Sequence, residues 1–326
     1  MLRPLLLAAA AAAACAAPPA IAPEVVAEAP GTSIVACGRR IDIGAPVVLW
    51  SDEEGYSAYD PDYRFGTPPV VGPNTPRFGD LRYKPGRTAR DTGLVEVEPE
   101  IGTFEQLERA LDLCVLHYDV CLTSQSCFKV LHDRRGLSVH FMLDVDGTLY
   151  QTMDLRDTAW HARQANPRSV GVEIANIGAY PLNDEGDAKL ARYYEKDADG
   201  ARIDFPRPTA ELGVRTPGYV ARPARRGVQM GRIHGTPYQQ YDFTAEQYAT
   251  LVKLTSALCR TFPNLRPDCP RDANGAVLLT NMDPETEAAF HGIVGHFHVG
   301  GHKQDPGPAF DWELFLTRVR TRLGRL

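Results

Sequence analysis

The feature that most constrains the fold is an alternation of helical and strand-like segments from about residue 101 to the C-terminus. The run TFEQLERALDL begins with a Thr-x-x-Gln capping box at Thr103 and Gln106. The run FTAEQYATLVKLTSALCRTF begins with a second box at Thr244 and Gln247, and it keeps an apolar face at helical spacing. Both runs predict helices, and FDWELFLTRVRTRL predicts a third helix that closes the chain.

Strand-like runs lie between these helices. The runs CVLHYD, SVGVEIAN and GIVGHFHV are short and apolar, and each predicts a buried strand. The segment SVHFMLDVDGTLYQTM consists of two alternating runs joined at Asp146 and Gly147, which predicts a β-hairpin. Because helices and strands alternate, we expect an α/β fold in which helices flank a central mixed β-sheet.

Two regions lack a long hydrophobic period. Residues 16–100 are rich in proline, glycine and charge, and they predict an irregular N-terminal extension that packs over the main domain, residues 101–326. Residues 180–242 are polar at first and then basic and turn-rich. A stretch of this length inside a domain predicts either a functional loop or a disordered insertion.

Residues 1–15 predict a targeting segment. They contain one arginine, a short apolar run and small residues, so we expect a secretory signal peptide rather than a transmembrane helix. The sequence AAAC also resembles a bacterial lipoprotein cleavage box in which Ala12 replaces the usual leucine, and this alternative predicts a lipid anchor at Cys15. Both alternatives predict an exported bacterial protein, which would lie in the periplasm, at the outer membrane or outside the cell.

The charge and composition narrow the class of partner. The net charge of −6 argues against a general nucleic-acid-binding protein, because no broad basic face is available for phosphates. With 44% hydrophobic and 23% charged residues, the composition is that of an ordinary globular protein. The sequence leaves the oligomeric state open.

The cysteines are consistent with export. Without Cys15, six of the 7 cysteines remain, and an even number in an exported chain predicts disulfides with about fifteen possible pairings. Cys121 and Cys127 are close enough in sequence to close one loop, and Cys259 and Cys269 are close enough to close another. A thiolate zinc site is the alternative, although no C-x-x-C spacing occurs.

Histidine and aspartate residues in distant segments predict a metal site. His117 ends the run VLHYD, and the segment GHFHVGGHKQDPGP contains His296 and Asp305. Catalytic zinc takes three protein ligands of these types and one water. The alternatives are a hydrogen-bonded core residue for His117 and a solvated, turn-rich loop for the glycine-rich segment.

Five segments occur in a characteristic order: VLHYD, SVHFMLDVDGTLYQTM, AWHA, NPRSVGVEIAN and GHFHVGGHKQDPGPAFDW. Together they resemble the zinc-dependent N-acetylmuramoyl-L-alanine amidases of the type 2 amidase and peptidoglycan recognition protein family. The resemblance implies a central mixed sheet with helices packed on it, a Zn²⁺ ion in a groove, and peptidoglycan or muropeptides as substrate. The run HYDVCLTSQSC also resembles the ligand-plus-disulfide segment of peptidoglycan recognition proteins, which implies a bond between Cys121 and Cys127.

Carried onto this sequence, the resemblance implies that His117, His296 and Asp305 are the zinc ligands. The segment from the second histidine to the aspartate is one residue shorter here than in relatives of the family, so His298 is the alternative to His296. We prefer His296, because "GH" directly follows the apolar strand.

The resemblance also implies roles for four further residues. Glu173 matches the catalytic acid/base, which takes the proton of the attacking water and passes it to the leaving amine. Lys303 matches a cation that stabilises the oxyanion. Trp160 and His161 of the AWHA segment are implied to contact sugar or peptide. The alternatives are a surface carboxylate for Glu173, a solvated lysine for Lys303, and a packed tryptophan beside a surface histidine.

The sequence therefore predicts a zinc-dependent enzyme that hydrolyses the amide between N-acetylmuramic acid and L-alanine during cell-wall turnover or remodelling. The alternative from another class is a peptidoglycan-binding protein that has the same fold and no activity. A second alternative is hydrolysis of another acyl-amino acid amide, such as a lipopeptide. The arginines of the insertion are candidates to bind stem-peptide carboxylates, unless the loop is merely solvated: Arg215, Arg222, Arg225, Arg226 and Arg232.

Overall fold

The structure is a computed structural model that describes residues 30–66, 79–87 and 103–324. The predicted signal segment and Cys15 lie outside the described residues. None of the helices in these three ranges is long and apolar enough to cross a membrane.

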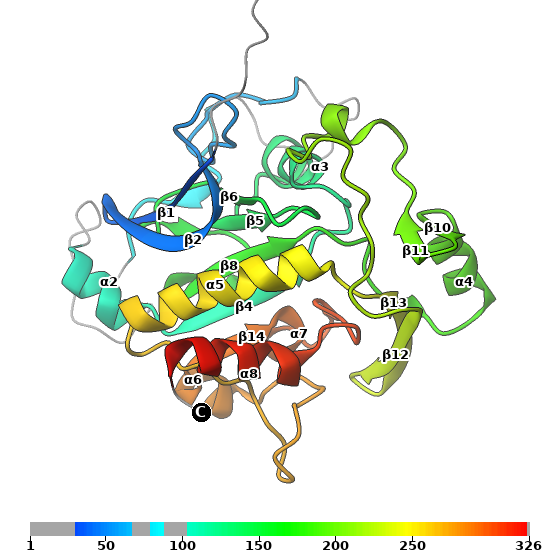
Figure 1. The fold of residues 1–326 in the computed structure, drawn as a ribbon. Helices are drawn as coiled ribbons and strands as arrows, with labels where there is room; N and C mark the ends of the chain where they lie inside the picture. Colours follow the sequence, from blue (N-terminus) through cyan, green and yellow to red (C-terminus); the bar gives the residue numbers. More distant parts are fainter. Residues whose placement is uncertain (1–29, 67–78, 88–102, 325–326) are drawn as a thin grey trace, which may run out of the picture.

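A seven-stranded mixed sheet forms the centre of the molecule (Figure 1), in the order β1-β2-β6-β5-β8-β4-β14. Two pairs, β1 with β2 and β5 with β6, are antiparallel, and the other four pairs are parallel. The expected fold class and the expected hairpin of β5 and β6 are therefore confirmed. The strands of the sheet are β1 (Gly31–Ala36), β2 (Arg39–Leu49), β4 (Leu113–Tyr118), β5 (Phe141–Leu143), β6 (Leu149–Gln151), β8 (Ser169–Ile174) and β14 (Gly292–Gly295).

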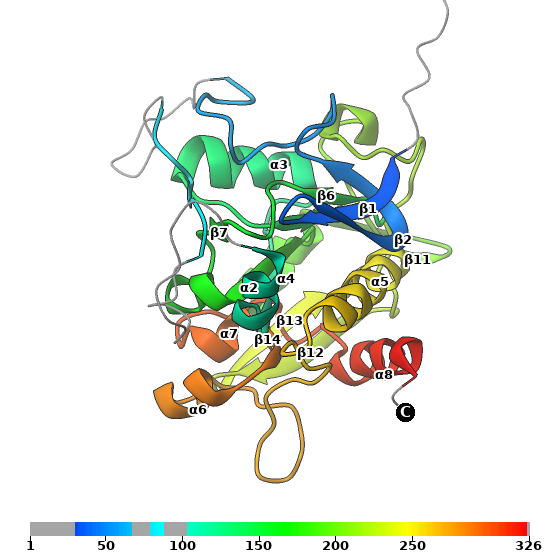
Figure 2. The same ribbon diagram turned by 90° about the vertical axis from the view of Figure 1, so that its left-hand side faces the viewer.

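Helices cover both faces of this sheet (Figures 1 and 2). On one face lie α5 (Ala245–Thr261) and α8 (Trp312–Leu323), and on the other lie α3 (Ser124–Phe128) and the π-helix η1 (Lys129–Arg135) that continues it. Both predicted capping boxes are present, at the N-termini of α2 and α5. The remaining helical elements are α2 (Phe104–Ala110), η2 (Arg163–Arg168), α4 (Asp184–Ala191), η3 (Thr209–Leu212), α6 (Pro284–Ala289) and α7 (His296–Val299).

The alternation of side chains along β8 and β4 separates the core from the polar face of the sheet. The core cluster beneath α5 takes every second residue of β8: Val170, Val172 and Ile174. Since successive side chains of a strand point to opposite faces, Ser169, Gly171 and Glu173 lie on the face away from α5. In β4, His117 is paired directly with Glu173 in the parallel register. The sheet register therefore places a histidine beside a buried carboxylate on the same face.

Strands β1 and β2 come from the region that was expected to be an irregular extension packed over the main domain. For residues 31–49 this expectation is wrong, because they form part of the central sheet. In β2, alternate residues enter the core beneath α5, and the strand pairs with β6: Ile43, Ala45, Val47 and Leu49. This period of two is present in the run IDIGAPVVLW, but proline and glycine around it obscured the pattern. The N-terminal region also contributes the two-residue strand β3 (Tyr83–Lys84), which pairs with β7 (Thr158–Ala159).

The polar segment 180–242 is also folded, contrary to the expectation of a loop or a disordered insertion. It forms a two-stranded and a three-stranded sheet, and its apolar residues share a hydrophobic cluster with Leu122, Val145 and Ile177 of the main domain. In this cluster the rings of Tyr194 and Tyr241 lie 4.1 Å apart. Its apolar residues are too widely spaced in sequence to show a period, yet they meet in space. The strands are β9 (Tyr180–Pro181), β10 (Tyr194–Asp197), β11 (Gly200–Ile203), β12 (Val228–Ile233) and β13 (Thr236–Tyr241).

Candidate metal centre

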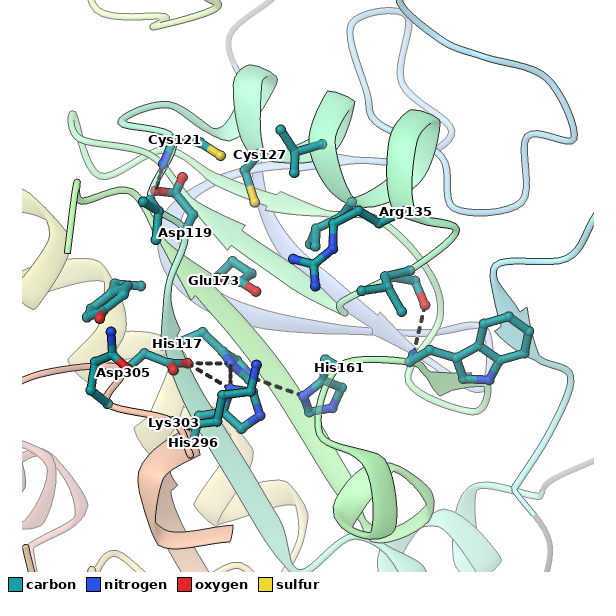
Figure 3. A pocket seen from close by; sticks show the side chains of 18 of the residues that line it. His117, Asp119, Cys121, Cys127, Arg135, His161, Glu173, His296, Lys303 and Asp305 are labelled. Carbon is teal, nitrogen blue, oxygen red and sulfur yellow. Dashed lines mark hydrogen bonds and ion pairs between the residues drawn. The ribbon is translucent and has the colours of Figure 1, made fainter. Parts of the chain in front are cut away.

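The three expected ligands converge at one end of the sheet (Figure 3). The Nδ1 atoms of His117 and His296 lie 3.0 Å apart, and each lies 2.9 Å from Oδ2 of Asp305. All three side chains are buried. The structure thus brings together residues that are 179 and 188 positions apart in the chain.

Three different elements position these side chains. His117 lies near the C-terminal end of β4, and β14 runs parallel beside it, so His296 emerges at the same edge. The predicted strand GIVGHFHV ends at Gly295, and His296 is the first residue of α7. Asp305 is fixed by its backbone oxygen, which accepts a hydrogen bond from the Phe297 amide at 3.1 Å.

Gly295, the last residue of β14, lets the backbone approach Pro306 of the following loop closely. A Cβ atom on Gly295 would lie 2.7 Å from Cδ of Pro306, which is closer than real Cβ contacts allow. Any side chain at position 295 would therefore push Pro306 away, and Asp305 with it.

His298, the alternative ligand, lies outside the cluster. Its Nδ1 accepts a hydrogen bond from the Gly295 amide at 2.8 Å, and its Nε2 donates to the Leu278 carbonyl at 2.7 Å. Both ring nitrogens are thereby used, and burial lowers the pKa of His298 to about 3. Because α7 turns His298 away from His117, the geometry favours His296 as the ligand.

The electrostatics of the cluster suit a divalent cation. Burial and the neighbouring His296 lower the pKa of His117 to about 4, so this imidazole is neutral at pH 7. Burial acts to raise the pKa of Asp305, but the adjacent His296 and His117 hold it below its ordinary value, so the carboxylate is ionised. Metal ligands must be deprotonated in this way. Two imidazole nitrogens and one carboxylate oxygen form a donor set that Zn²⁺ accepts in catalytic sites.

Glu173 faces the same cavity as the cluster, and Figure 3 shows it above His117. Only 9% of the residue is exposed, and its Oε2 atom has no hydrogen-bond partner among the described residues. Burial, with smaller contributions from Asp305 and Asp119, raises the pKa of this carboxyl well above its ordinary value. An unpartnered buried carboxyl is costly, and the burial of Glu173 excludes the alternative of a surface carboxylate.

The cavity has a volume of about 310 Å³ and is lined by both cationic and aromatic side chains. Lys303 lines it beside the cluster, as expected, and Trp160 also contributes to the wall. Arg135, the last residue of η1, lines the cavity as well, and no feature of the sequence indicated this position. Neither Lys303 nor Arg135 forms an ion pair with another described residue.

Asp119 is a second residue of the cavity that the sequence did not reveal. Its Oδ1 atom accepts hydrogen bonds from the backbone amides of Cys121, Leu122 and Asn176. The turn that it organises holds Val120 and Leu122 at positive φ, at 55° and 67°. A β-branched residue is rarely found in this conformation, so Asp119 maintains the shape of this cavity wall.

The expected disulfide between Cys121 and Cys127 is not formed in the structure. The two thiols are instead in hydrogen-bond contact. Burial raises the pKa of the Cys127 thiol well above its ordinary value.

The arginines of segment 180–242 do not line the cavity. Arg215 pairs with Glu54, Arg222 with Asp197, and Arg225 with Asp242. Arg232 donates to the Gly235 carbonyl. These side chains stabilise the folded insertion and its contacts with the rest of the chain.

His161, the other expected cavity residue of the AWHA segment, contacts the cluster directly. Its Nδ1 atom lies 3.0 Å from Nε2 of His117, and Figure 3 shows it on the side of His117 away from Asp305. Burial, followed by the proximity of His117 and His140, lowers the pKa of His161 well below its ordinary value.

Comparison with known proteins identifies one family. The family model described as N-acetylmuramoyl-L-alanine amidase matches residues 107–308, a range that includes all three clustered residues and Glu173. None of the curated proteins searched matches the chain.

Several solved structures are also similar. A selenomethionine derivative of AmpD is 15% identical over 83% of this chain and 98% of its own, with a TM-score of 0.33. The amidase LysC from Clostridium intestinale URNW is 14% identical over 67% and 88%, also with a TM-score of 0.33. AmiD from E. coli, in complex with anhydro-N-acetylmuramic acid-L-Ala-D-gamma-Glu-L-Lys, is 17% identical over 64% and 57%, with a TM-score of 0.34.

Proposed function

The chain belongs to the N-acetylmuramoyl-L-alanine amidase family, and from this premise we propose that it is a zinc-dependent hydrolase of the amide between N-acetylmuramic acid and L-alanine. The family assignment confirms the expected enzyme class and a peptidoglycan amidase activity. The observation that supports the finer proposal is the convergence of two imidazole nitrogens and one carboxylate oxygen beside the buried, unpartnered Glu173. The substrate would be peptidoglycan or its muropeptide fragments, as part of cell-wall turnover or remodelling.

The residues of the cavity divide the work of amide hydrolysis. His117, His296 and Asp305 would hold the ion, which when bound lowers the pKa of water from about 15.7 to about 7 and polarises a carbonyl. Oε2 of Glu173 accepts the proton of the attacking water and then delivers it to the nitrogen of the departing L-alanine. The ammonium group of Lys303 stabilises the negative charge that develops on the lactyl carbonyl oxygen.

Metal removal and product analysis test this proposal. Treatment with a chelator should abolish clearing in a peptidoglycan zymogram, and added Zn²⁺ should restore it. Mass spectrometry of the digest should detect stem peptides that begin with a free L-alanine amine. Zinc-free protein with no clearing would instead support the non-catalytic binding protein. Products without that free amine would point to another acyl-amino acid amide as the substrate.

Arg135 is expected to bind a carboxylate of the stem peptide, because it is an unpaired cation in the wall of the cavity. A hydrogen bond to a charged group contributes about 1.5–3 kcal/mol. Arg135→Ala should therefore raise KM for a soluble muropeptide by about tenfold or more and change kcat much less. The matched control is Arg134→Ala, since Arg134 is its exposed neighbour on η1 and does not line the cavity. Equal kinetic effects of the two substitutions would contradict this role.

Export is part of the proposal, because the predicted substrate lies outside the cytoplasm. Residues 1–15 would direct export, and Cys15 is the candidate for a lipid anchor. Intact-mass measurement of membrane-extracted protein distinguishes the alternatives. A mass increased by acyl groups on a chain that begins at Cys15 supports the anchor, whereas an unmodified chain that begins after Cys15 supports a plain signal peptide.

A further inference from the structure

The sequence resemblance implied that His161 contacts sugar or peptide, but in the structure both of its ring nitrogens are engaged within the protein. Nδ1 lies 3.0 Å from Nε2 of His117, and Nε2 lies 3.2 Å from Oγ of Ser169. The rings of His117 and His161 meet edge to face, with centroids 5.2 Å apart and an interplanar angle of 85°. A residue that recognises substrate through its polar edge would need at least one free ring nitrogen.

The hydrogen bonds that link His117, His161 and Ser169 have a consistent donor-to-acceptor direction. If Nδ1 of His117 is a metal ligand, it carries no proton, and the neutral ring has its proton on Nε2. That N–H then donates to Nδ1 of His161, so the neutral His161 ring has its own proton on Nε2. This second N–H donates to Oγ of Ser169. The tautomer of each histidine is thereby determined by its hydrogen-bond acceptor, and Ser169 is the last residue of this hydrogen-bonded series.

Packing holds the His161 ring in the position that this chain requires. A Cβ atom on Gly171 would lie 2.7 Å from Cε1 and Nδ1 of His161, so the ring rests directly on the backbone of β8. The backbone amide of His161 donates to Oδ1 of Asn166 at 3.1 Å. The ring is therefore fixed by its own backbone, by the surface of the sheet and by Ser169.

The far end of the chain is fixed as well. The guanidinium of Arg87 is buried and donates to the carbonyl of Ser169 at 3.0 Å and to the carbonyl of Pro167 at 2.8 Å. Arg87 belongs to the N-terminal region, which thus reaches beneath the segment that carries His161 and Ser169. A series of hydrogen bonds therefore leads from His117 through His161 and Ser169 to the buried Arg87.

We propose that His161 is a positioning residue for the metal centre: with Ser169 it orients the His117 imidazole and keeps its Nδ1 atom unprotonated. This inference rests on the proposed function, because it concerns a ligand of the metal that function requires. Residues that hydrogen-bond to a metal-ligating histidine typically change metal affinity by about 10–100-fold when they are replaced. The effect of His161 should therefore be visible in zinc binding without any substrate.

Zinc affinity of the full-length protein, measured by competition with a chromophoric chelator, tests the proposal. His161→Leu keeps a similar volume and removes the acceptor, so it should weaken zinc binding by about 10–100-fold. His161→Asn places an amide oxygen near the position of Nδ1 and should recover most of that loss. Ser169→Ala should weaken binding in the same direction by a smaller factor. His302→Ala is the matched control, because His302 lines the same cavity and is exposed, and its affinity should equal that of the wild type.

The outcomes separate this inference from the proposed function. Wild-type affinity in His161→Leu, together with a raised KM for muropeptide, would overturn the positioning role in favour of substrate contact. Equal losses in the leucine and asparagine variants would overturn it in favour of packing alone. If His161→Leu does not fold by circular dichroism, Ser169→Ala decides, and unchanged affinity there overturns the proposal. Wild-type protein that binds no zinc would overturn the proposed function, and the inference with it.

Discussion

Glu173→Gln should reduce the turnover of a soluble muropeptide by about 10²–10⁴-fold, the range that general acid–base catalysis typically contributes. The amide of glutamine fills nearly the same volume but cannot accept the proton of the attacking water. Because Glu173 is a neighbour of the ligand cluster and not a member of it, the variant should keep its zinc. Turnover is measured by chromatographic separation of the peptide product, and zinc by elemental analysis of the same preparation.

Glu185→Gln provides the control, because it makes the same chemical change at an exposed residue of α4 that does not line the cavity. It should have wild-type turnover. Full activity of Glu173→Gln would show that another group accepts the proton. Loss of zinc from Glu173→Gln would show that the carboxylate belongs to the metal ligands, and the assignment of the base would again be wrong.

His296→Ala should lose both zinc and activity, whereas His298→Ala should keep zinc. Binding of structural zinc contributes on the order of 10 kcal/mol in small zinc domains, so the loss of one of three ligands should weaken affinity by at least about 10²-fold. His298 makes two hydrogen bonds and is fully buried, so its replacement should instead lower the free energy of unfolding by about 2–4 kcal/mol.

Zinc content and denaturant unfolding of the two variants are measured side by side. The pair is a stringent comparison, because the two histidines are separated by one residue and differ in where α7 directs them. The opposite pattern, with zinc lost only from His298→Ala, would exchange the two assignments. Retention of zinc by both variants would mean that the cluster of His117, His296 and Asp305 is not the metal site.

The elements that were predicted correctly have local signals. In each capping box, at the start of α2 and of α5, the threonine and the glutamine lie three positions apart in the sequence. The hairpin of β5 and β6 is marked by the turn residues Asp146 and Gly147. The structure departs from prediction where the signal is dispersed. Strand β2 has a clear alternation but lies among prolines and glycines, and segment 180–242 has apolar residues that meet only after the chain has folded.

The site shows the same division. The types of residue and their order along the chain were sufficient to propose His117, Glu173, His296, Lys303 and Asp305, and these roles stay predictions until they are measured. The sequence carried no signal for Arg135 or Asp119. Arg135 is one of two adjacent arginines at the end of a helix, and only the position of η1 over the sheet directs it into the cavity.

The sequence by itself determined the α/β class, the main helices and strands, and the set of side chains from which a metal site can be built. These depend on periods and caps that extend over a few neighbouring residues. Only the tertiary structure shows that His296, and not His298, lies in the cluster with His117 and Asp305, and that the His161 ring lies within hydrogen-bond distance of His117. The parallel register of β14, β4 and β8 brings the ends of these strands together, so that His117 meets His296, which is 179 residues away in the sequence. The start of α7 directly after β14 then turns His298 away from His117.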